Sequence, residues 1–151
     1  MKLSTRARYA LRLMIDLADH EGHAPVALRD VSERQKISRR YLEHLATNLR
    51  NAKLIASVPG KNGGYSLQRS PEEIPIAEII GASIGRVDLI RCVSAPKLCD
   101  RAEVCPSRRM WSKITERIDE VLGTVTLAEL RECRLEREHG PAIGRSPCSS
   151  E

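Results

Sequence analysis

One stretch of turn-forming residues constrains the fold of this 151-residue chain more than any other feature. Residues 59–64 read Pro-Gly-Lys-Asn-Gly-Gly, and glycine tolerates at little cost the positive φ angles that tight turns require. β-Capable runs flank this stretch at residues 54–58 and 65–68. The pattern therefore predicts an antiparallel β-hairpin.

Three helices are predicted ahead of this hairpin. Ser4 can cap the first, in which apolar residues recur at three- and four-residue steps. A short second helix fits residues 28 to about 35, and Ser38 is a good N-cap for a third helix that ends near residue 51. Helix, helix, turn, helix and hairpin is the order of a winged helix-turn-helix. We therefore predict a mainly α fold with a small β-hairpin.

The second half of the chain is predicted to be helical apart from an irregular stretch at residues 85–106. Pro106 opens the longest helix, which runs to about residue 122, and Thr126 begins a capping box for a last helix. The predicted organisation has four parts: a winged helix-turn-helix DNA-binding domain (1–83), a cysteine loop (84–106), a long helix followed by a C-terminal helix (107–138), and a disordered tail (139–151).

Positive charge is concentrated in the N-terminal half. Residues 1–70 carry 13 Lys and Arg against 6 Asp and Glu, whereas residues 71–151 carry 12 against 14. The surplus favours double-stranded DNA as the partner, because the second helix of a helix-turn-helix enters the major groove and a basic wing can approach phosphates. The alternative is that these arginines only make a helical bundle soluble. The candidate DNA-binding residues are Arg6, Arg8, Ser38, Arg39, Arg40, Tyr41, Glu43, Lys61, Asn62, Gly63 and Gly64.

Three of the five cysteines lie close together in the irregular stretch, at Cys92, Cys99 and Cys105. Thiolates are soft ligands that suit zinc or an iron–sulfur cluster. The spacing C-x6-C-x5-C differs from the paired C-x2-C of a zinc ribbon, which disfavours zinc. Buried structural cysteines and a disulfide-forming thiol switch are the alternatives. The sequence does not single out a fourth ligand.

Several classes of protein do not match the sequence. The basic N-terminus is not followed by a signal-peptide pattern, and no apolar run approaches membrane-spanning length. We therefore expect a cytoplasmic protein with reduced cysteines and no membrane partner. An enzyme is not expected, because no nucleophile–base–acid set, phosphate-cradling glycine loop or catalytic zinc spacing is found. No small-molecule substrate is predicted either.

Four stretches resemble the bacterial family of IscR- and NsrR-like transcription regulators, and the similarity spans about residues 1–135. They are MKLSTRARYA at residues 1–10, ISRRYLE at 37–43, GKNGGY at 60–65, and the three cysteines that lead into Trp111. The resemblance implies a winged-helix homodimer whose promoter binding is controlled by an iron–sulfur cluster on the three cysteines, with [2Fe–2S] favoured over [4Fe–4S]. It also implies pairing through the long helix, whose apolar residues are Trp111, Ile114, Ile118, Val121 and Leu122.

This chain departs from that family at the ligand positions. IscR-like members have a histidine ligand where this chain has Arg108, and NsrR-like members use an acidic residue where it has Arg8. The first cysteine gap is also six residues, where those members have five. A guanidinium is a very poor ligand, so a carboxylate, a partner-subunit residue or an exogenous group is left as fourth ligand. By the same resemblance, Glu43 lies where some members discriminate between operators.

The sequence thus predicts a dimeric transcription regulator, a repressor in its mode of action, that senses redox state, oxygen, nitric oxide or iron–sulfur supply. One alternative keeps DNA binding but assigns control to a thiol switch or a partner protein. Another is an iron–sulfur carrier or electron-transfer protein with an incidental basic face. The arginine-led helix and the glycine-rich wing favour the DNA binder.

Overall fold

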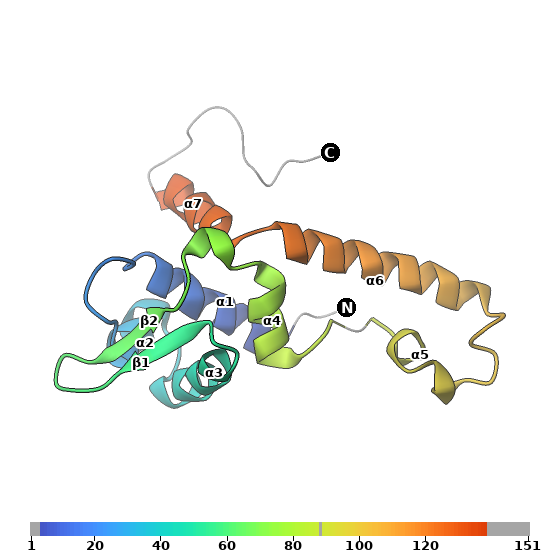
Figure 1. Cartoon of the computed structure of the whole chain (residues 1–151), viewed down its shortest axis with the longest axis horizontal. Coiled ribbons are helices and arrows are strands. Elements are labelled where there is room, and N and C mark those ends of the chain that lie inside the picture. The colour runs from blue at the N-terminus through green and yellow to red at the C-terminus, as the bar shows by residue number, and fades with distance from the viewer. Residues whose placement is uncertain (1–3, 88, 139–151) are drawn as a thin grey trace.

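The computed structural model describes residues 4–87 and 89–138 (Figure 1). The predicted disordered tail lies outside the described residues. The described chain is mainly α-helical with one two-stranded antiparallel hairpin, as predicted. In order, its elements are α1 (Thr5–Ala18), α2 (Leu28–Gln35), α3 (Arg39–Asn51), β1 (Ile55–Val58), β2 (Gly64–Leu67), the 3-10 turn η1 (Pro71–Glu73), α4 (Ile76–Ile84), α5 (Arg91–Ser94), the 3-10 turn η2 (Pro96–Leu98), α6 (Pro106–Thr124) and α7 (Leu127–Glu138).

Helices α1, α2 and α3 form the core of the body. The predicted caps are present, since Ser4 Oγ accepts a hydrogen bond from Arg6 N and Ser38 Oγ accepts one from Tyr41 N. Between α2 and α3 the chain turns at Lys36, whose φ of 54° is left-handed. The apolar faces of the three helices meet in one cluster, whose fully buried members include Ala10, Leu13, Met14, Val31, Leu42, Leu45 and Leu49.

The hairpin follows α3 directly and forms the wing. Its register pairs Ile55 with Leu67 and Val58 with Gly64. A backbone bridge between Val26 and Tyr65 ties the second strand to the chain before α2. Gly64 must be glycine, because a Cβ there would lie 2.4 Å from the carbonyl oxygen of Val26. The wing is therefore anchored to the helix-turn-helix through backbone contacts.

The chain returns to this body after α6. Helix α4 packs on α1 and α3, and α7 packs on α1 and η1. Backbone hydrogen bonds join Leu127 N to Ile74 O and Ile76 N to Val125 O, and Leu127 is fully buried. These contacts fix the C-terminal end of α6, while its N-terminal end reaches away from the body (Figure 1).

The predicted irregular stretch contains short helical turns, α5 and η2, which the sequence pattern did not predict. Pro96 starts η2, and Ala95 N donates to Arg91 O at 2.8 Å to close α5. The α5 turn packs on η2 and on α6. Among the described residues, no helix is both long enough and apolar enough to cross a membrane.

Candidate DNA-binding face and cysteine loop

The first turn of α3 presents the predicted recognition residues. Arg39, Arg40 and Glu43 are exposed, and Ser38 caps the helix below them. Arg39 Nε donates to Glu43 Oε1 at 2.9 Å. An exposed pair of this kind contributes at most about 1 kcal/mol, so DNA can displace it at little cost. The pair holds the Arg39 guanidinium along the helix when DNA is absent.

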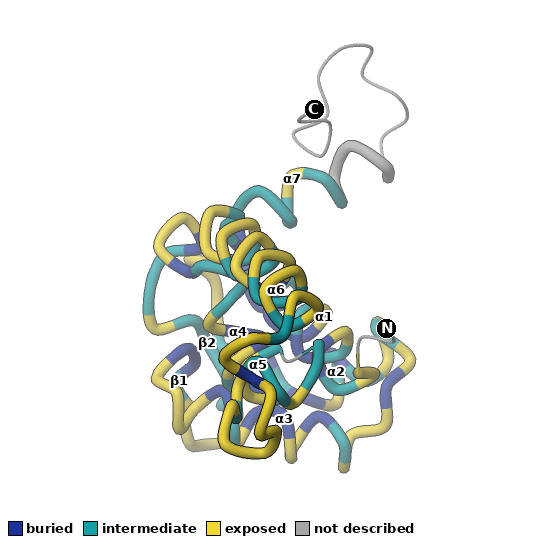
Figure 2. The backbone as a smooth tube through the Cα atoms, turned by 90° about the vertical axis from the view of Figure 1, so that its right-hand side faces the viewer, coloured by how far each residue is buried: buried dark blue, intermediate teal, exposed yellow. Residues whose placement is uncertain are grey.

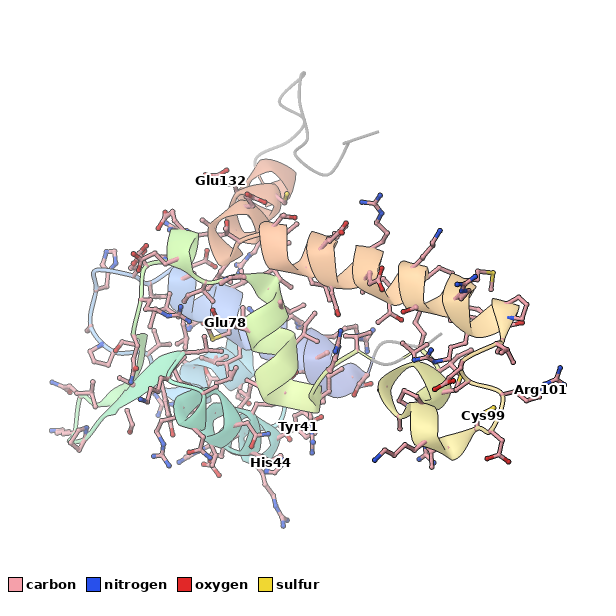
Figure 3. The ribbon with its side chains drawn as sticks, turned by 45° about the vertical axis from the view of Figure 1, so that its right-hand side comes forward. Tyr41, His44, Glu78, Cys99, Arg101 and Glu132 are labelled. Atoms are coloured by element: carbon pink, nitrogen blue, oxygen red, sulfur yellow. The ribbon has the colours of Figure 1, made fainter. Side chains whose placement is uncertain are left out.

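The start of α1 lies against α3. The guanidinium of Arg6 lies 3.1 Å from His44 Nε2, and the Tyr9 and Tyr41 rings meet edge to face with centroids 5.7 Å apart. Tyr41 is half-buried in this contact, so its ring fixes the angle of the recognition helix. Figure 3 shows Tyr41 and His44 together on α3. His44 was not among the predicted residues, although it lies one turn after Arg40 on the same helix.

A hollow of about 440 Å³ separates the recognition helix from the wing. The predicted residues Arg39, Glu43 and Lys61 line it together with the backbone of Gly63 and Gly64. Arg29, at the start of α2, also lines this hollow and was missed by the sequence analysis. Lys61 and Asn62 are exposed at the wing tip. Arg8 is exposed on α1, with its guanidinium 5.9 Å from the centre of the Tyr9 ring.

The three cysteines lie on the segment that leads into α6. Cys92 is in α5, Cys99 follows η2, and Cys105 is the N-cap of α6. Cys99 is exposed and the other two are half-buried, and each is a thiol rather than half of a disulfide. Figure 3 shows Cys99 and Arg101 at the outer end of α6.

Arg108 lies in the first turn of α6 and joins the two arms of this loop. Its Nε donates to Cys92 O at 2.8 Å, and its Nη1 donates to Ala102 O at 3.4 Å. Ala102 is buried beside these contacts. The side chain thus satisfies backbone carbonyls, which agrees with the expectation that a guanidinium does not act as a ligand.

Three thiols provide suitable donors for an iron–sulfur cluster. They do not form a closed ligand set in this conformation, because no three His, Cys, Asp or Glu side chains among the described residues are gathered to hold a metal ion. The loop contacts the rest of the described chain chiefly through α6. The donor chemistry therefore fits a cluster, but the thiols would have to move together to bind it.

The outer face of α6 is apolar and uncovered in the subunit. Val121 is 59% exposed and Ile114 38% exposed. These two residues, with Ile118 and Leu122, line a shallow hollow of about 460 Å³. Trp111, the fifth residue predicted for pairing, is half-buried. Figure 2 shows exposed residues along most of α6.

An arginine-led helix of a helix-turn-helix, beside a glycine-tipped wing, defines a winged helix-turn-helix DNA-binding protein. The sequence model of the Rrf2 family, described as an iron-dependent transcriptional regulator, matches residues 3–132. The chain belongs to the Rrf2 family of transcriptional regulators.

Individual relatives agree with this assignment. The chain is 42% identical over 130 residues to the HTH-type transcriptional regulator IscR of Sodalis glossinidius, covering 86% of this chain and 78% of the relative. The structure of T. potens IscR is similar with a TM-score of 0.73 and 35% identity, covering 95% of this chain and 94% of that one. The structure of CymR, the global cysteine regulator of B. subtilis, is similar to this chain with a TM-score of 0.74 and 33% identity. The match covers 88% of this chain and 98% of CymR. The predicted resemblance to IscR-like regulators is thereby confirmed.

Proposed function

We propose that this protein is a homodimeric repressor whose operator binding is controlled by an iron–sulfur cluster held by Cys92, Cys99 and Cys105. One observation carries the proposal: all three thiols lie in the weakly packed segment at the outer end of α6. The description of the family as iron-dependent supports iron in particular. When bound, the cluster would supply a redox-sensitive cross-link between parts of this loop.

A [2Fe–2S] cluster is the favoured form, and its fourth ligand has to come from outside the three thiols. Arg108 is not that ligand, because its guanidinium already donates to Cys92 O and Ala102 O. Asp100 and Glu103 offer carboxylates within the same loop. A residue of the partner subunit or an exogenous group could also complete the set.

The apolar face of α6 supports pairing of two subunits. Large exposed apolar patches of this kind mark interaction surfaces, and the neighbouring residues Lys113 and Arg117 give the hollow a polar edge. Two copies that pair along α6 would bring two recognition helices into one dimer. Operators for such dimers have half-sites about one DNA turn apart.

Control of DNA binding would act through α6. Its N-terminal end carries the cysteine loop, and its C-terminal end is fixed to the body through Val125 and Leu127. A change in the shape of the loop would alter the contacts at the start of α6, and so the spacing of the two recognition helices. The residues of this chain that transmit the change are those of α6 and its backbone contacts with η1 and α4.

The test is anaerobic purification with iron and acid-labile sulfide counted and the visible spectrum recorded. We expect a coloured protein with both elements, and loss of colour in Cys92→Ala, Cys99→Ala and Cys105→Ala. Cys133→Ala, on α7, is the matched control and should keep the cluster. Loaded and cluster-free protein are then compared for binding to the operator at fixed salt. Equal affinities would refute control by the cluster, and absence of iron and sulfide would refute the cluster itself.

A thiol switch without a cluster is the second candidate. It is supported by the separate positions of the three thiols, which form no closed ligand set among the described residues, and by the similarity to a cysteine regulator, CymR. Under this candidate, iron-free protein treated with an oxidant such as diamide forms a disulfide within the loop and changes its affinity for DNA. Peptide mass mapping of the oxidised protein identifies the pair.

A further inference from the structure

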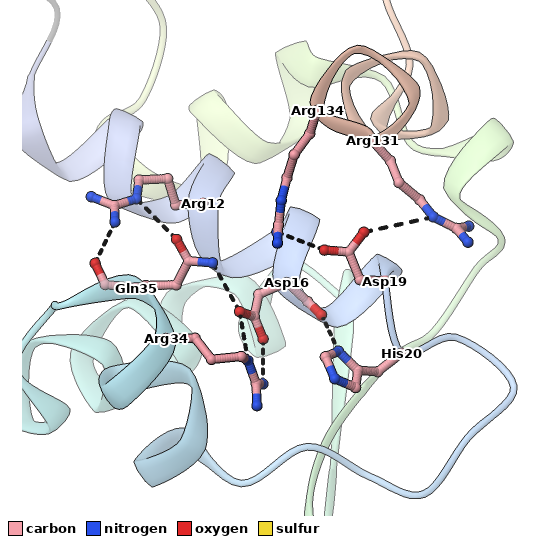
Figure 4. A network of polar contacts seen from close by, with 8 residues as sticks. All are labelled: Arg12, Asp16, Asp19, His20, Arg34, Gln35, Arg131 and Arg134. Carbon is pink, nitrogen blue, oxygen red and sulfur yellow. Dashed lines mark hydrogen bonds and ion pairs between the residues drawn. The ribbon is translucent and has the colours of Figure 1, made fainter. Parts of the chain in front are cut away.

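A hollow of about 330 Å³ lies between α1, α2 and α7, away from the recognition helix and the cysteine loop. Its lining comprises Arg12 and Ile15 from α1, Arg34 and Gln35 from α2, and Arg134 from α7. Figure 4 shows Arg34 held by Asp16 and Arg134 held by Asp19, whereas Arg12 contacts Gln35. DNA binding and the cysteine loop, as described above, leave this arrangement unexplained.

Arg34 is oriented by a buried carboxylate. Asp16 is 1% exposed, and its two oxygens accept hydrogen bonds from Arg34 Nη2 at 2.6 Å and Arg34 Nε at 3.1 Å. Gln35 Nε2 donates to the same carboxylate at 2.9 Å. The Arg34 side chain is still 38% exposed, so one edge of its guanidinium is open. The bidentate contact fixes the plane of the guanidinium, as in preorganised anion sites.

Arg134 is oriented in a similar way from α7. Its Nη1 donates to Asp19 Oδ2 at 2.6 Å, and Arg131 Nε lies 3.8 Å from the other oxygen of that carboxylate. Asp16 lies in α1 and Asp19, three residues further on, is the C-cap of that helix, so the two carboxylates lie on neighbouring turns of one face. The two carboxylates thus direct arginines from α2 and α7 toward the same hollow.

Arg12 carries the surplus charge. Within the described residues its guanidinium contacts neutral groups: Nε donates to Gln35 Oε1 at 3.1 Å, Nη2 donates to Gln35 O, and the guanidinium lies 5.6 Å from the centre of the Tyr9 ring. The carboxylates of Asp16 and Asp19 contact Arg34, Arg131 and Arg134, whereas the guanidinium of Arg12 contacts Gln35 instead. The contacts that hold α2 and α7 to α1 are made by the two carboxylates and do not require the positive charge of Arg12.

We propose that this hollow binds the phosphate group of an anionic ligand. Guanidinium groups present paired N–H donors that match phosphate oxygens, and the volume suits a small molecule. Ile15 provides an apolar contact for the remainder of such a ligand. Since the lining comes from three helices, a bound anion would bridge the helix-turn-helix to α7. The phosphate could belong to a free small molecule or to the DNA backbone, and the test distinguishes the two.

The probe is inorganic phosphate, titrated into the full chain at constant ionic strength and followed by calorimetry and ³¹P NMR. We expect saturable binding of one phosphate per subunit. Arg12→Gln should weaken this affinity by about tenfold or more, since it removes a charge-assisted donor. Arg12→Lys keeps the positive charge but loses the paired N–H donors of the guanidinium, so its phosphate affinity should lie between those of the wild type and Arg12→Gln. Arg50→Gln, an exposed arginine at the end of α3, is the control and should leave the affinity unchanged.

A second arm identifies the source of the phosphate. If the DNA backbone fills the hollow, Arg12→Gln lowers the salt-dependence slope of duplex binding by about 0.9; if a free anion fills it, that slope is unchanged. Wild-type protein that shows no saturable phosphate binding, or Arg12→Gln that binds phosphate as tightly as wild type, would overturn the proposal. The phosphate titration requires neither a cluster nor an operator, so its failure is distinct from a failure of the proposed function.

Discussion

Replacing Asp16 by Asn is expected to lower the free energy of unfolding by about 3 kcal/mol. Removing one partner of a buried pair costs about 3–5 kcal/mol, because the other partner loses its charged acceptor. We expect the lower end of this range of costs, because the Arg34 side chain is 38% exposed and water can replace part of its contact with Asp16. Asp16 accepts three hydrogen bonds, and an amide oxygen cannot accept all of them. For a chain of this size, the loss corresponds to a fall in Tm of roughly 6–12 °C.

The assay is urea unfolding followed by circular dichroism at pH 7, with Asp19→Asn as the matched control one turn further along α1. Burial raises the pKa of Asp19 above its ordinary value of 3.8, because Arg134 and Arg131 only partly offset the loss of hydration. Its ionised form is therefore less well stabilised, and we expect Asp19→Asn to cost less than about 1 kcal/mol. A loss below about 1 kcal/mol for Asp16→Asn, or equal losses for the two variants, would refute the reasoning.

The pH dependence of the Asp16 effect has a definite sign. Burial by itself raises the pKa of Asp16, but hydrogen bonds from Arg34 and Gln35 and the charge of Arg34 together outweigh burial, so the pKa lies below its ordinary value of 3.8. A lowered pKa contributes stability that is present above pH 3.8 and is lost as the pH falls through the lowered value. Asp19 has the opposite sign: the stability that comes from its raised pKa is fully present below pH 3.8 and is lost as the pH rises through the raised pKa of the folded protein. The difference between wild type and Asp16→Asn should therefore shrink in acid.

Three further predictions concern DNA binding, pairing and the wing. Arg39→Ala and Lys61→Ala should each weaken binding to any duplex and flatten its salt dependence by up to about 0.9 in slope, measured by fluorescence anisotropy from 50 to 200 mM salt; an unchanged slope counts against their placement. Val121→Asp should convert a dimer to monomers in light scattering, since it puts a charge into the apolar face of α6; a persisting dimer rejects that face. Gly64→Ala should destabilise the fold by about 1–3 kcal/mol in urea unfolding, because its Cβ would meet Val26 O; wild-type stability contradicts the close approach.

Local signals were enough to predict most of the fold. Ser4 and Ser38 cap helices as predicted, because a cap depends on residues within one turn. The first strand was predicted one residue too long. Leu54 N donates to Leu49 O instead of joining the sheet, although Leu54 O accepts from Gln68 N. Such a boundary depends on how the preceding helix ends, which β-propensity does not reveal.

The contacts behind the arginine-lined hollow could not be predicted from the sequence. Asp19 and Arg134 are 115 residues apart, and Asp16 reads locally as one polar residue on a helix. Its burial follows from the way α2 crosses α1, which brings Arg34 over the carboxylate. The spacing of apolar residues along the sequence does not indicate where α2 crosses α1. The recognition helix and wing were easier to predict, because their residues lie close together in the sequence.

The cysteine loop has the properties expected of the part of the molecule that changes. A segment with few buried apolar contacts opens at low free energy, and among the described residues of this loop Ala102 alone is a buried apolar residue. Two hydrogen bonds from Arg108 join its arms through backbone carbonyls, so they do not depend on which thiols are bound or oxidised. Under the proposed function, substitution of a thiol would therefore leave the loop folded but unable to respond. The body, by contrast, is fixed by a buried core. Under the proposed function, a movement that begins at the loop would therefore reach DNA as a rigid displacement of α3.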